Sequence, residues 1–167
     1  MNLHEAGPTE VVCRPVGTIR SRFEAAVGTP IQTIAAPEET AMLEVFPQYA
    51  AGLRDLEPFE FVILITHFHD CRHERLEVAP FLDDRTHGVF ATRAPTRPNR
   101  LGISIVRLIR IDGATVHFSG NDMVDGTPVL DIKPYVPRFD ARNTECIGWF
   151  SGRLDALPGT VADGRMA

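Results

Sequence analysis

Two segments of this chain contain the residue types from which a site for a charged small molecule can be built. Residues 88–100, the arginine segment, have three arginines among glycine and proline residues. Residues 121–135, the aspartate segment, contain Asp122 and Asp125 in a turn-rich sequence. Guanidinium groups suit carboxylate and phosphate oxygens, and carboxylates suit cations. The two segments therefore indicate a site for a ligand that has charges of both signs.

The residues between these segments predict a hairpin. Two runs of β-forming residues, 101–111 and 114–119, are joined at Asp112-Gly113. This dipeptide favours the positive φ angles of a tight hairpin turn. Because a hairpin reverses the chain, we expect the arginine segment and the aspartate segment to lie on the same side of the molecule.

The cationic charge is concentrated in one window. The stretch from Arg85 to Ile111 has six arginines and no acidic residue, in a chain whose net charge is −5, and Lys133 is the only lysine. One basic patch on an acidic protein suits a small anionic ligand or a limited RNA contact better than long duplex DNA. A cationic strand face exposed to water remains the alternative.

A second candidate site lies after the most apolar run of the chain. His67, His69, Asp70 and His73 follow one another closely, which suggests a hydrolytic metal site. The spacing differs from the His-x-His-x-Asp-His pattern of metallo-β-lactamase-like enzymes, because Asp70 directly follows His69 and His73 falls one residue late. The sequence therefore disfavours a metal site, and the alternatives are histidines at a strand end or histidines that contact a ligand.

The elements that must position these residues are mostly short strands. Residues 59–68 form the most apolar run of the chain and predict a central strand buried on both faces, and Pro15 makes residues 11–20 a bent or edge strand. The other expected elements are strands at 41–46 and 129–133, a loop at 23–39 and a short helix that begins at Pro47. This pattern predicts a mainly β, small single-domain antiparallel sheet or barrel with one or two short helices.

Composition limits the class of protein. With 167 residues, 44% hydrophobic and 23% charged, the chain is typical of one soluble globular domain. The N-terminus has no secretory signal, no apolar run reaches the ~20 residues that span a bilayer, and three separated cysteines indicate reduced thiols. We expect a cytoplasmic protein, with a domain at residues 1–150 and a loose C-terminal tail at residues 151–167.

Three motifs give a family resemblance. Phe90-Ala91-Thr92-Arg93, Arg97-Pro98-Asn99 and the run from Asp122 to Tyr135 closely resemble the TsaA/TrmO (YaeB-like) family, and the resemblance extends over residues 12–137. Members are S-adenosylmethionine-dependent methyltransferases built on a small β-barrel. The better-known members methylate N6 of threonylcarbamoyladenosine next to the tRNA anticodon.

The resemblance also implies site residues. Those expected to bind S-adenosylmethionine are Pro30, Ile31, Gln32, His69, Asp70, Arg93, Ile103, Asp122, Met123, Val124 and Asp125. Those expected to bind the tRNA substrate are Arg97, Asn99, Arg100 and Lys133. Three positions depart from the family pattern, because Ile31 stands where the family has arginine, Arg100 stands where it has proline, and residues 60–63 replace a Ser-His-hydrophobic-Trp sequence.

The resemblance implies an activity with two alternatives. The expected reaction transfers the methyl group in line to N6 of the modified adenosine, with Asp125 and His69 as candidate proton acceptors. The family is dimeric, so we expect a homodimer, and we expect no membrane partner. The first alternative is a β-barrel module that binds the cofactor but methylates no tRNA, because we expect this chain to be a short form without the C-terminal domain of longer members. The second is a metal-dependent hydrolase that uses His67 and His69.

Overall fold

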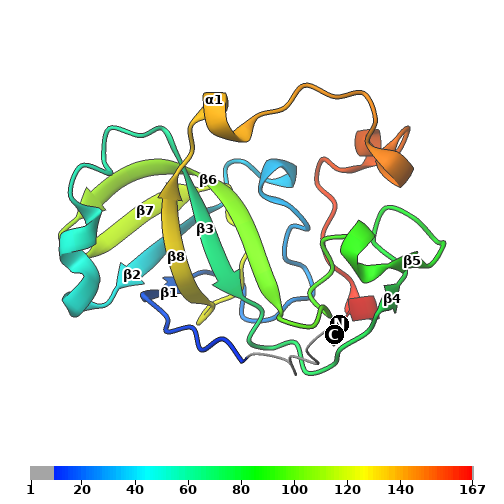
Figure 1. The fold of residues 1–167 in the computed structure, drawn as a ribbon, viewed down its shortest axis with the longest axis horizontal. Coiled ribbons are helices and arrows are strands. Elements are labelled where there is room, and N and C mark those ends of the chain that lie inside the picture. The colour runs from blue at the N-terminus through cyan, green and yellow to red at the C-terminus, as the bar shows by residue number, and fades with distance from the viewer. Residues whose placement is uncertain (1–9, 167) are drawn as a thin grey trace, which may run out of the picture.

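The computed structural model describes residues 10–166, and it consists of a barrel and a smaller lobe (Figure 1). The first nine residues, in which the sequence predicts no secretory signal, and Ala167 lie outside the described residues. The strands are β1 (Gly17–Arg20), β2 (Thr40–Val45), β3 (Phe61–His67), β4 (Glu77–Val78), β5 (His87–Gly88), β6 (Leu101–Asp112), β7 (Thr115–Ser119) and β8 (Pro128–Pro134). The helices are α1 (Pro137–Asp140) and 3-10 helices at Thr33–Ala35, Pro47–Leu53, Val89–Ala91, Gly148–Phe150, Leu154–Ala156 and Gly164–Met166.

Six strands close the barrel that the sequence predicted. Their order is β1, β2, β7, β6, β3, β8, and every hydrogen-bonded pair is antiparallel. The strand expected over residues 11–20 is shorter than predicted, because β1 begins only at Gly17. It is also not an edge strand, since it hydrogen-bonds to β2 on one side and to β8 on the other. The presence of Pro15 suggested an edge strand, but a closed barrel has no free edge.

Alternation along each strand separates the core from the outer wall. On β3 the side chains of Val62 and Leu64 are fully buried inside the barrel, while Ile63 faces outward and is still only 9% exposed. The prediction that this strand is buried on both faces is therefore confirmed at its centre. Phe118 on β7 is the largest fully buried side chain of the core. The interior is packed like other protein cores, so it is not a channel.

The predicted hairpin is confirmed and is closely packed at its base. β6 and β7 pair on either side of a turn at residues 113–114, and Gly113 has a φ of 60°, as a tight turn requires. At the other end of β6, a Cβ atom on Gly102 would lie 2.5 Å from Thr66 Oγ1. The short expected helix is also present, as a 3-10 helix that begins at Pro47.

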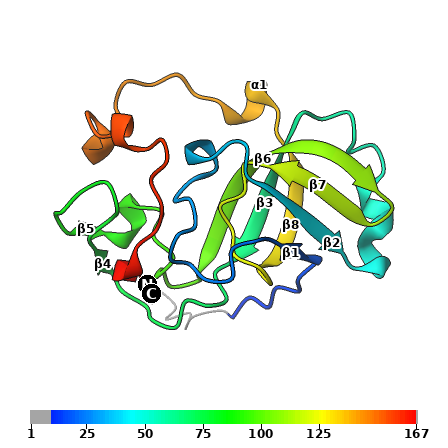
Figure 2. The ribbon, with the colours of Figure 1, turned by 180° about the vertical axis from the view of Figure 1, so that it is seen from behind.

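The smaller lobe is formed by β4, β5 and the C-terminal segment, which lie side by side in both ribbon views (Figures 1 and 2). Val78, Val89 and Ala94 form its own small core. The tail that composition predicted to be loose instead pairs with the loop before β2, through a bridge between Pro30 and Val161. Few residues of the segment are large and apolar, but four backbone hydrogen bonds join it to residues 28–35.

The helices of residues 10–166 are all too short or too polar to cross a lipid bilayer.

Candidate functional site

Asp122 lies at the centre of the cluster that the hairpin brings together. Its Oδ1 accepts a hydrogen bond from Ser104 Oγ at 2.7 Å. Burial raises the pKa of Asp122 to about 6, although the hydrogen bond from Ser104, the nearby Arg93 guanidinium and the backbone of Thr33 oppose that rise. A carboxyl group that is poorly solvated and faces one guanidinium is a feature typical of ligand-binding sites.

The backbone around Asp122 is fixed by its neighbour. Asn121 is fully buried, and its Nδ2 donates to Ser21 Oγ at 2.8 Å and to the Met123 carbonyl at 3.1 Å. The Met123 N–H donates back to Asn121 Oδ1 at 3.1 Å. The turn is therefore closed from both sides, which sets the direction of the Asp122 side chain. Neither Asn121 nor Ser104 was among the predicted site residues.

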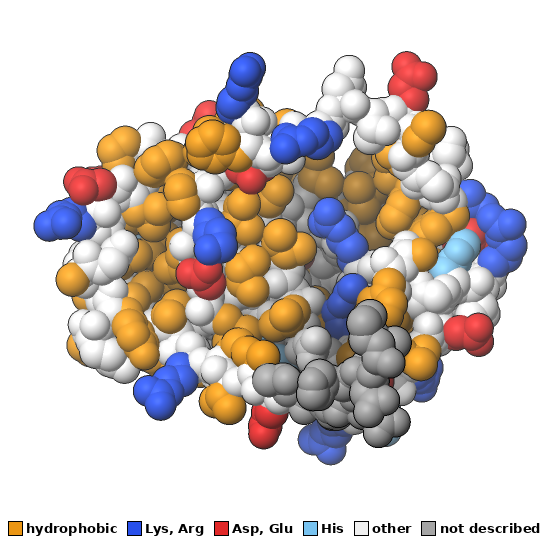
Figure 3. All heavy atoms as spheres, viewed as in Figure 1, with side chains coloured by type: hydrophobic (Ala, Val, Ile, Leu, Met, Phe, Trp, Pro, Cys, Tyr) orange, Lys and Arg blue, Asp and Glu red, His pale blue; other side chains and the backbone are white. Residues whose placement is uncertain are grey.

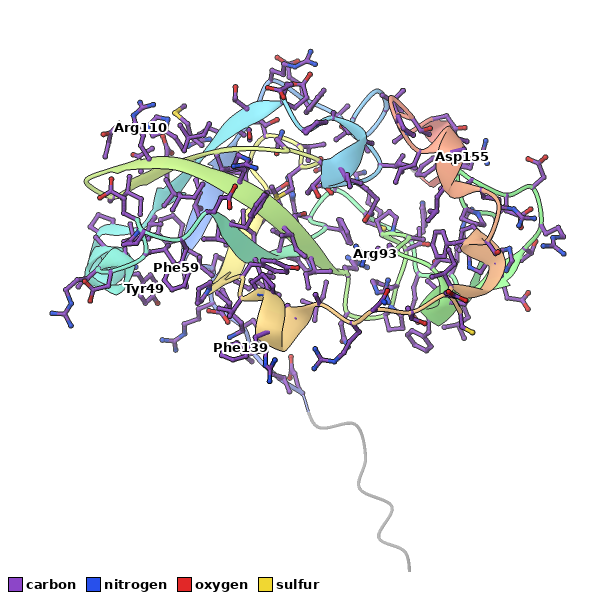
Figure 4. All side chains as sticks on the ribbon, turned by 90° about the horizontal axis from the view of Figure 1, so that it is seen from above. Tyr49, Phe59, Arg93, Arg110, Phe139 and Asp155 are labelled. Carbon is purple, nitrogen blue, oxygen red and sulfur yellow. The ribbon has the colours of Figure 1, made fainter. Side chains whose placement is uncertain are left out.

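A second pair of predicted residues meets across the site. Arg93 Nη1 donates to Gln32 Oε1 at 2.8 Å, between loops that are 61 residues apart in the sequence. Arg93 is exposed and lies between the barrel and the smaller lobe, whereas Asp155 marks the far corner of that lobe (Figure 4). Gln32, Arg93 and Asp122, which were expected at the cofactor, are thus brought together.

Asp125 and His69 form a separate group on the other side of the same turn. Asp125 Oδ1 accepts from the Ser21 N–H at 3.0 Å, and its Oδ2 lies 3.8 Å from Arg20 Nη1. Gly126, whose φ is 77°, faces His69, because a Cβ atom there would lie 3.6 Å from His69 Nε2. His69 Nε2 in turn lies 3.4 Å from Asp70 Oδ1.

An open groove of about 470 Å³ lies beside Asp125, on the outer wall of β1, β2, β6 and β7. It includes neither Asp122 nor Arg93, so this groove is not the place where the predicted cofactor residues converge. We give more weight to the convergence, because a binding site needs placed polar groups as well as space.

Three of the remaining cofactor positions differ in exposure. Pro30 is buried, and Ile103 points outward from β6 with 49% of its surface exposed. The side chain of Met123 is 5% exposed and packs in the barrel core, so only its backbone is available to a ligand. Ile31 and Val124 are half-buried on the loops that flank Asp122.

The expected substrate residues are held in different ways. Arg97 Nη1 donates to the Thr92 carbonyl at 3.2 Å, so it braces the arginine segment, while Asn99 is exposed. Arg100 has a φ of 51°, which a proline could not adopt because its ring fixes φ near −65°. The departure from the family proline therefore has a backbone cause. Lys133 pairs with Asp131 at 2.6 Å on the outer wall of β8.

Within residues 10–166, no three His, Cys, Asp or Glu side chains gather as a metal site would require. His67 and His69 therefore lack the further ligands that a catalytic zinc site needs, and the arrangement around them does not favour the hydrolase alternative.

Comparisons with known proteins agree with the resemblance in the motifs. A family model described as the tRNA-methyltransferase O N-terminal domain matches residues 18–141. The chain is 46% identical over 158 residues to a probable S-adenosyl-L-methionine-binding protein of Pyrococcus abyssi, covering 95% of this chain and 86% of that protein. It is 38% identical to the mouse tRNA (adenine(37)-N6)-methyltransferase, covering 82% of this chain but only 33% of the mouse protein.

The fold is also that of a solved structure. A crystal structure of TrmO from Pseudomonas aeruginosa superposes with a TM-score of 0.71 at 38% identity, covering 84% of this chain and 63% of the solved one. The chain thus spans most of the archaeal relative but less than two thirds of that bacterial chain and a third of the mouse enzyme.

Proposed function

Because the chain belongs to the family of the tRNA-methyltransferase O N-terminal domain, we propose that it is an S-adenosylmethionine-dependent methyltransferase that acts on tRNA. The observation that supports this most directly is the convergence of Gln32, Arg93 and Asp122, which come from three separate loops. Polar groups of opposite charge that converge from separate loops are typical of ligand-binding sites.

The charges of the site fit the proposed cofactor. S-adenosylmethionine has an ammonium and a sulfonium cation at one end, together with a carboxylate. Asp122 offers the anion, and burial makes its charge strong at short range because few water molecules screen it. Arg93 offers the cation and is free to reach a carboxylate on its exposed side. The two groups attract each other across the site, which matches a ligand of mixed charge.

The bound cofactor would supply a methyl group on a positively charged sulfur. The residues of this chain would hold the cofactor in one orientation and would accept the proton that the acceptor nitrogen loses. Of the two proton acceptors expected from the sequence, we favour His69. One oxygen of Asp125 already accepts a backbone hydrogen bond and the other lies near Arg20, so both of its oxygens have partners within the protein.

We further propose that the acceptor is N6 of threonylcarbamoyladenosine. The arginine segment has more positive charge than a neutral adenine needs, and the threonyl carboxylate would supply the matching anion. Arg97 is tied to the Thr92 carbonyl by one nitrogen, which leaves the rest of its guanidinium group available. Arg100 is half-buried in the same loop.

Cofactor binding is tested by titration calorimetry with S-adenosylhomocysteine. We expect saturable binding that Arg93→Ala weakens about tenfold, or about 1.4 kcal/mol. Lys133→Ala is the matched control, since Lys133 pairs with Asp131 on the outer wall of the barrel. Absence of heat and of a thermal shift at millimolar ligand would count against the proposal.

The acceptor is tested with tRNA from cells that can and cannot make the threonylcarbamoyl modification. After incubation with labelled cofactor, mass spectrometry of the nucleosides should show methylation only in the modified tRNA. Equal methylation of both would refute the role of the threonyl carboxylate.

A cofactor-binding module without this activity is the second candidate. It is favoured by the name of the Pyrococcus relative, which refers to binding only. Tight binding of S-adenosylhomocysteine together with no methylation of either tRNA would support it.

We also propose a cytoplasmic homodimer. The outer wall of β6 exposes Leu101, Ile103, Ile105 and Ile109, and apolar side chains cover much of this face of the barrel (Figure 3). By contrast, the apolar residues Phe59, Phe61 and Ile63 are half-buried or buried, and β3 is not an edge strand, so they offer less surface to a partner. An exposed apolar face of this kind is typical of subunit interfaces.

A further inference from the structure

The C-terminal strap, residues 142–166, lies beyond residues 18–141 that match the family model, yet it contacts both loops of the candidate site. Figure 2 shows this segment descending between the smaller lobe and the loop before β2. Nothing in the proposed chemistry needs the strap to touch a ligand. It instead contacts the backbone before Arg93, at Ala91, and the backbone on both sides of Gln32.

The first contact fixes the arginine segment. Trp149 Nε1 donates to the Ala91 carbonyl at 2.8 Å, two residues before Arg93. The indole ring stacks on Phe150 at 3.8 Å and on His87 at 4.6 Å, measured between ring centroids. The stacked rings of His87 and Phe150 thus hold the indole in place, and the indole N–H fixes the position of the loop at Ala91.

A buried carboxylate fastens this part of the strap to the smaller lobe. Asp83 Oδ2 lies 3.0 Å from His87 Nε2, 3.3 Å from Arg85 Nη2 and 3.2 Å from Arg153 Nη2. Arg153 Nη1 also donates to the Trp149 carbonyl at 2.7 Å. Burial raises the pKa of Asp83, but hydrogen bonds from His87 and Arg85 and the charge of Arg153 outweigh it and keep the pKa well below its usual range.

The second contact fixes the loop that contains Gln32. The Gly28 N–H donates to the Ala162 carbonyl at 2.8 Å, and the Ala162 N–H donates to the Thr29 carbonyl at 2.7 Å. The Ile31 N–H donates to the Thr160 carbonyl at 3.3 Å. These are backbone bonds, so they set the path of the loop directly before Gln32.

We propose that the strap is a positioning element for the cofactor site and that Trp149 is its key positioning residue. The Arg93–Gln32 hydrogen bond joins two irregular loops, and ordering such loops on ligand binding costs conformational entropy. The strap orders both loops before the ligand arrives. This inference rests on the proposed function for the identity of the ligand, but not for the contacts themselves.

The test uses Trp149→Phe in the full chain, which removes the indole N–H and keeps an aromatic ring against His87 and Phe150. We expect the affinity for S-adenosylhomocysteine to fall about three- to tenfold, the effect of one lost hydrogen bond. Amide hydrogen exchange should become faster in residues 90–97, while exchange in the barrel strands stays unchanged. Leu154→Ala, on an exposed side chain of the same strap, should change neither quantity.

Two further measurements make the result independent of a folding defect. Arg153→Gln removes the hydrogen bond that Arg153 donates to the Trp149 carbonyl, and it should give the same local increase in amide hydrogen exchange. The chain has one tryptophan, so the tryptophan fluorescence of the wild-type protein reports the surroundings of Trp149, and it should change little when S-adenosylhomocysteine saturates the site, because the strap orders both loops beforehand.

The outcomes separate this inference from the proposed function. If the wild-type protein binds no S-adenosylhomocysteine, the proposed function fails, while faster exchange in residues 90–97 of both variants would still support the strap. If the wild-type protein binds but the variants keep its affinity and its exchange rates, the positioning role is refuted.

Discussion

Asp122 makes cofactor binding depend on pH in a direction that the structure determines. Its pKa is raised from 3.8 to about 6 because the carboxyl group is removed from water. Near pH 5 the group is therefore mostly neutral, and above pH 7 it is mostly ionised. A cationic ligand favours the ionised form, so we expect binding to strengthen as pH rises through about 6 and to level off above pH 7.

The size of the effect follows from the ionised fraction. With a pKa of about 6, about one tenth of the free protein is ionised at pH 5, and apparent affinity scales with the competent fraction. The dissociation constant for S-adenosylmethionine should therefore be about tenfold weaker at pH 5 than at pH 8, or about 1.4 kcal/mol. Ser104→Ala removes a hydrogen bond that stabilises the charge, so it should move the midpoint to higher pH.

The assay is calorimetric titration at constant ionic strength from pH 5 to pH 8, on the wild-type protein, Ser104→Ala and Asp122→Asn. Because histidines titrate in the same range, Asp122→Asn is the control that assigns the step to this carboxyl group. It should bind more weakly at pH 8 and lose most of the dependence. A flat profile in the wild-type protein, or an equal slope in Asp122→Asn, would refute the reasoning.

The same raised pKa predicts that Asp122→Asn raises the thermal midpoint of the ligand-free protein at pH 8 by a few degrees. Between pH 4 and pH 6 the carboxyl group of residue 122 loses its proton in the unfolded state before it does so in the folded state. The free energy of unfolding therefore falls as pH rises through this range and stays lower above pH 6. Gln32→Ala frees Arg93 and should weaken S-adenosylhomocysteine binding about three- to tenfold in calorimetry. Gly17→Ala should cost about 1–3 kcal/mol in denaturant unfolding, because its Cβ would lie 2.5 Å from a backbone oxygen, whereas Gly52→Ala meets nothing within 4 Å and should cost none. Ile105→Asp should shift sedimentation equilibrium from a dimer towards 18.5 kDa, and a wild-type monomer would contradict the dimer.

The fold was largely predictable because its signals are local. Periodicity and turn chemistry predicted β2, β3, β8 and the hairpin at Gly113, since each depends on residues that are adjacent in the chain. Barrel closure was not a local property. Whether β1 has one neighbour or two depends on where β8 lies, and composition alone does not distinguish a barrel from a sandwich.

The site shows the same division. The residue types in the arginine and aspartate segments and the resemblance of their motifs to a family indicated Gln32, Arg93 and Asp122 as members of one site, and the structure brings all three together. Ser104 could have been suspected as a polar residue on the inward face of an apolar strand. The roles of Asp125 and His69 stay predictions, and their placement on the far side of the turn is a result that no spacing rule gives.

The C-terminal strap shows most clearly what the tertiary structure alone decided. Residues 151–167 are mostly small or polar, so hydrophobic patterning predicts little order for them. Order comes instead from backbone hydrogen bonds to residues 28–31 and from the ion pairs of Asp83. Of the partners of Asp83, Arg153 is distant in the sequence, and His87 is near but belongs to no recognisable motif. Side-chain pattern determines which faces of a chain are buried, whereas backbone pairing between two irregular segments depends on their positions in space, and only the folded barrel brings those positions together.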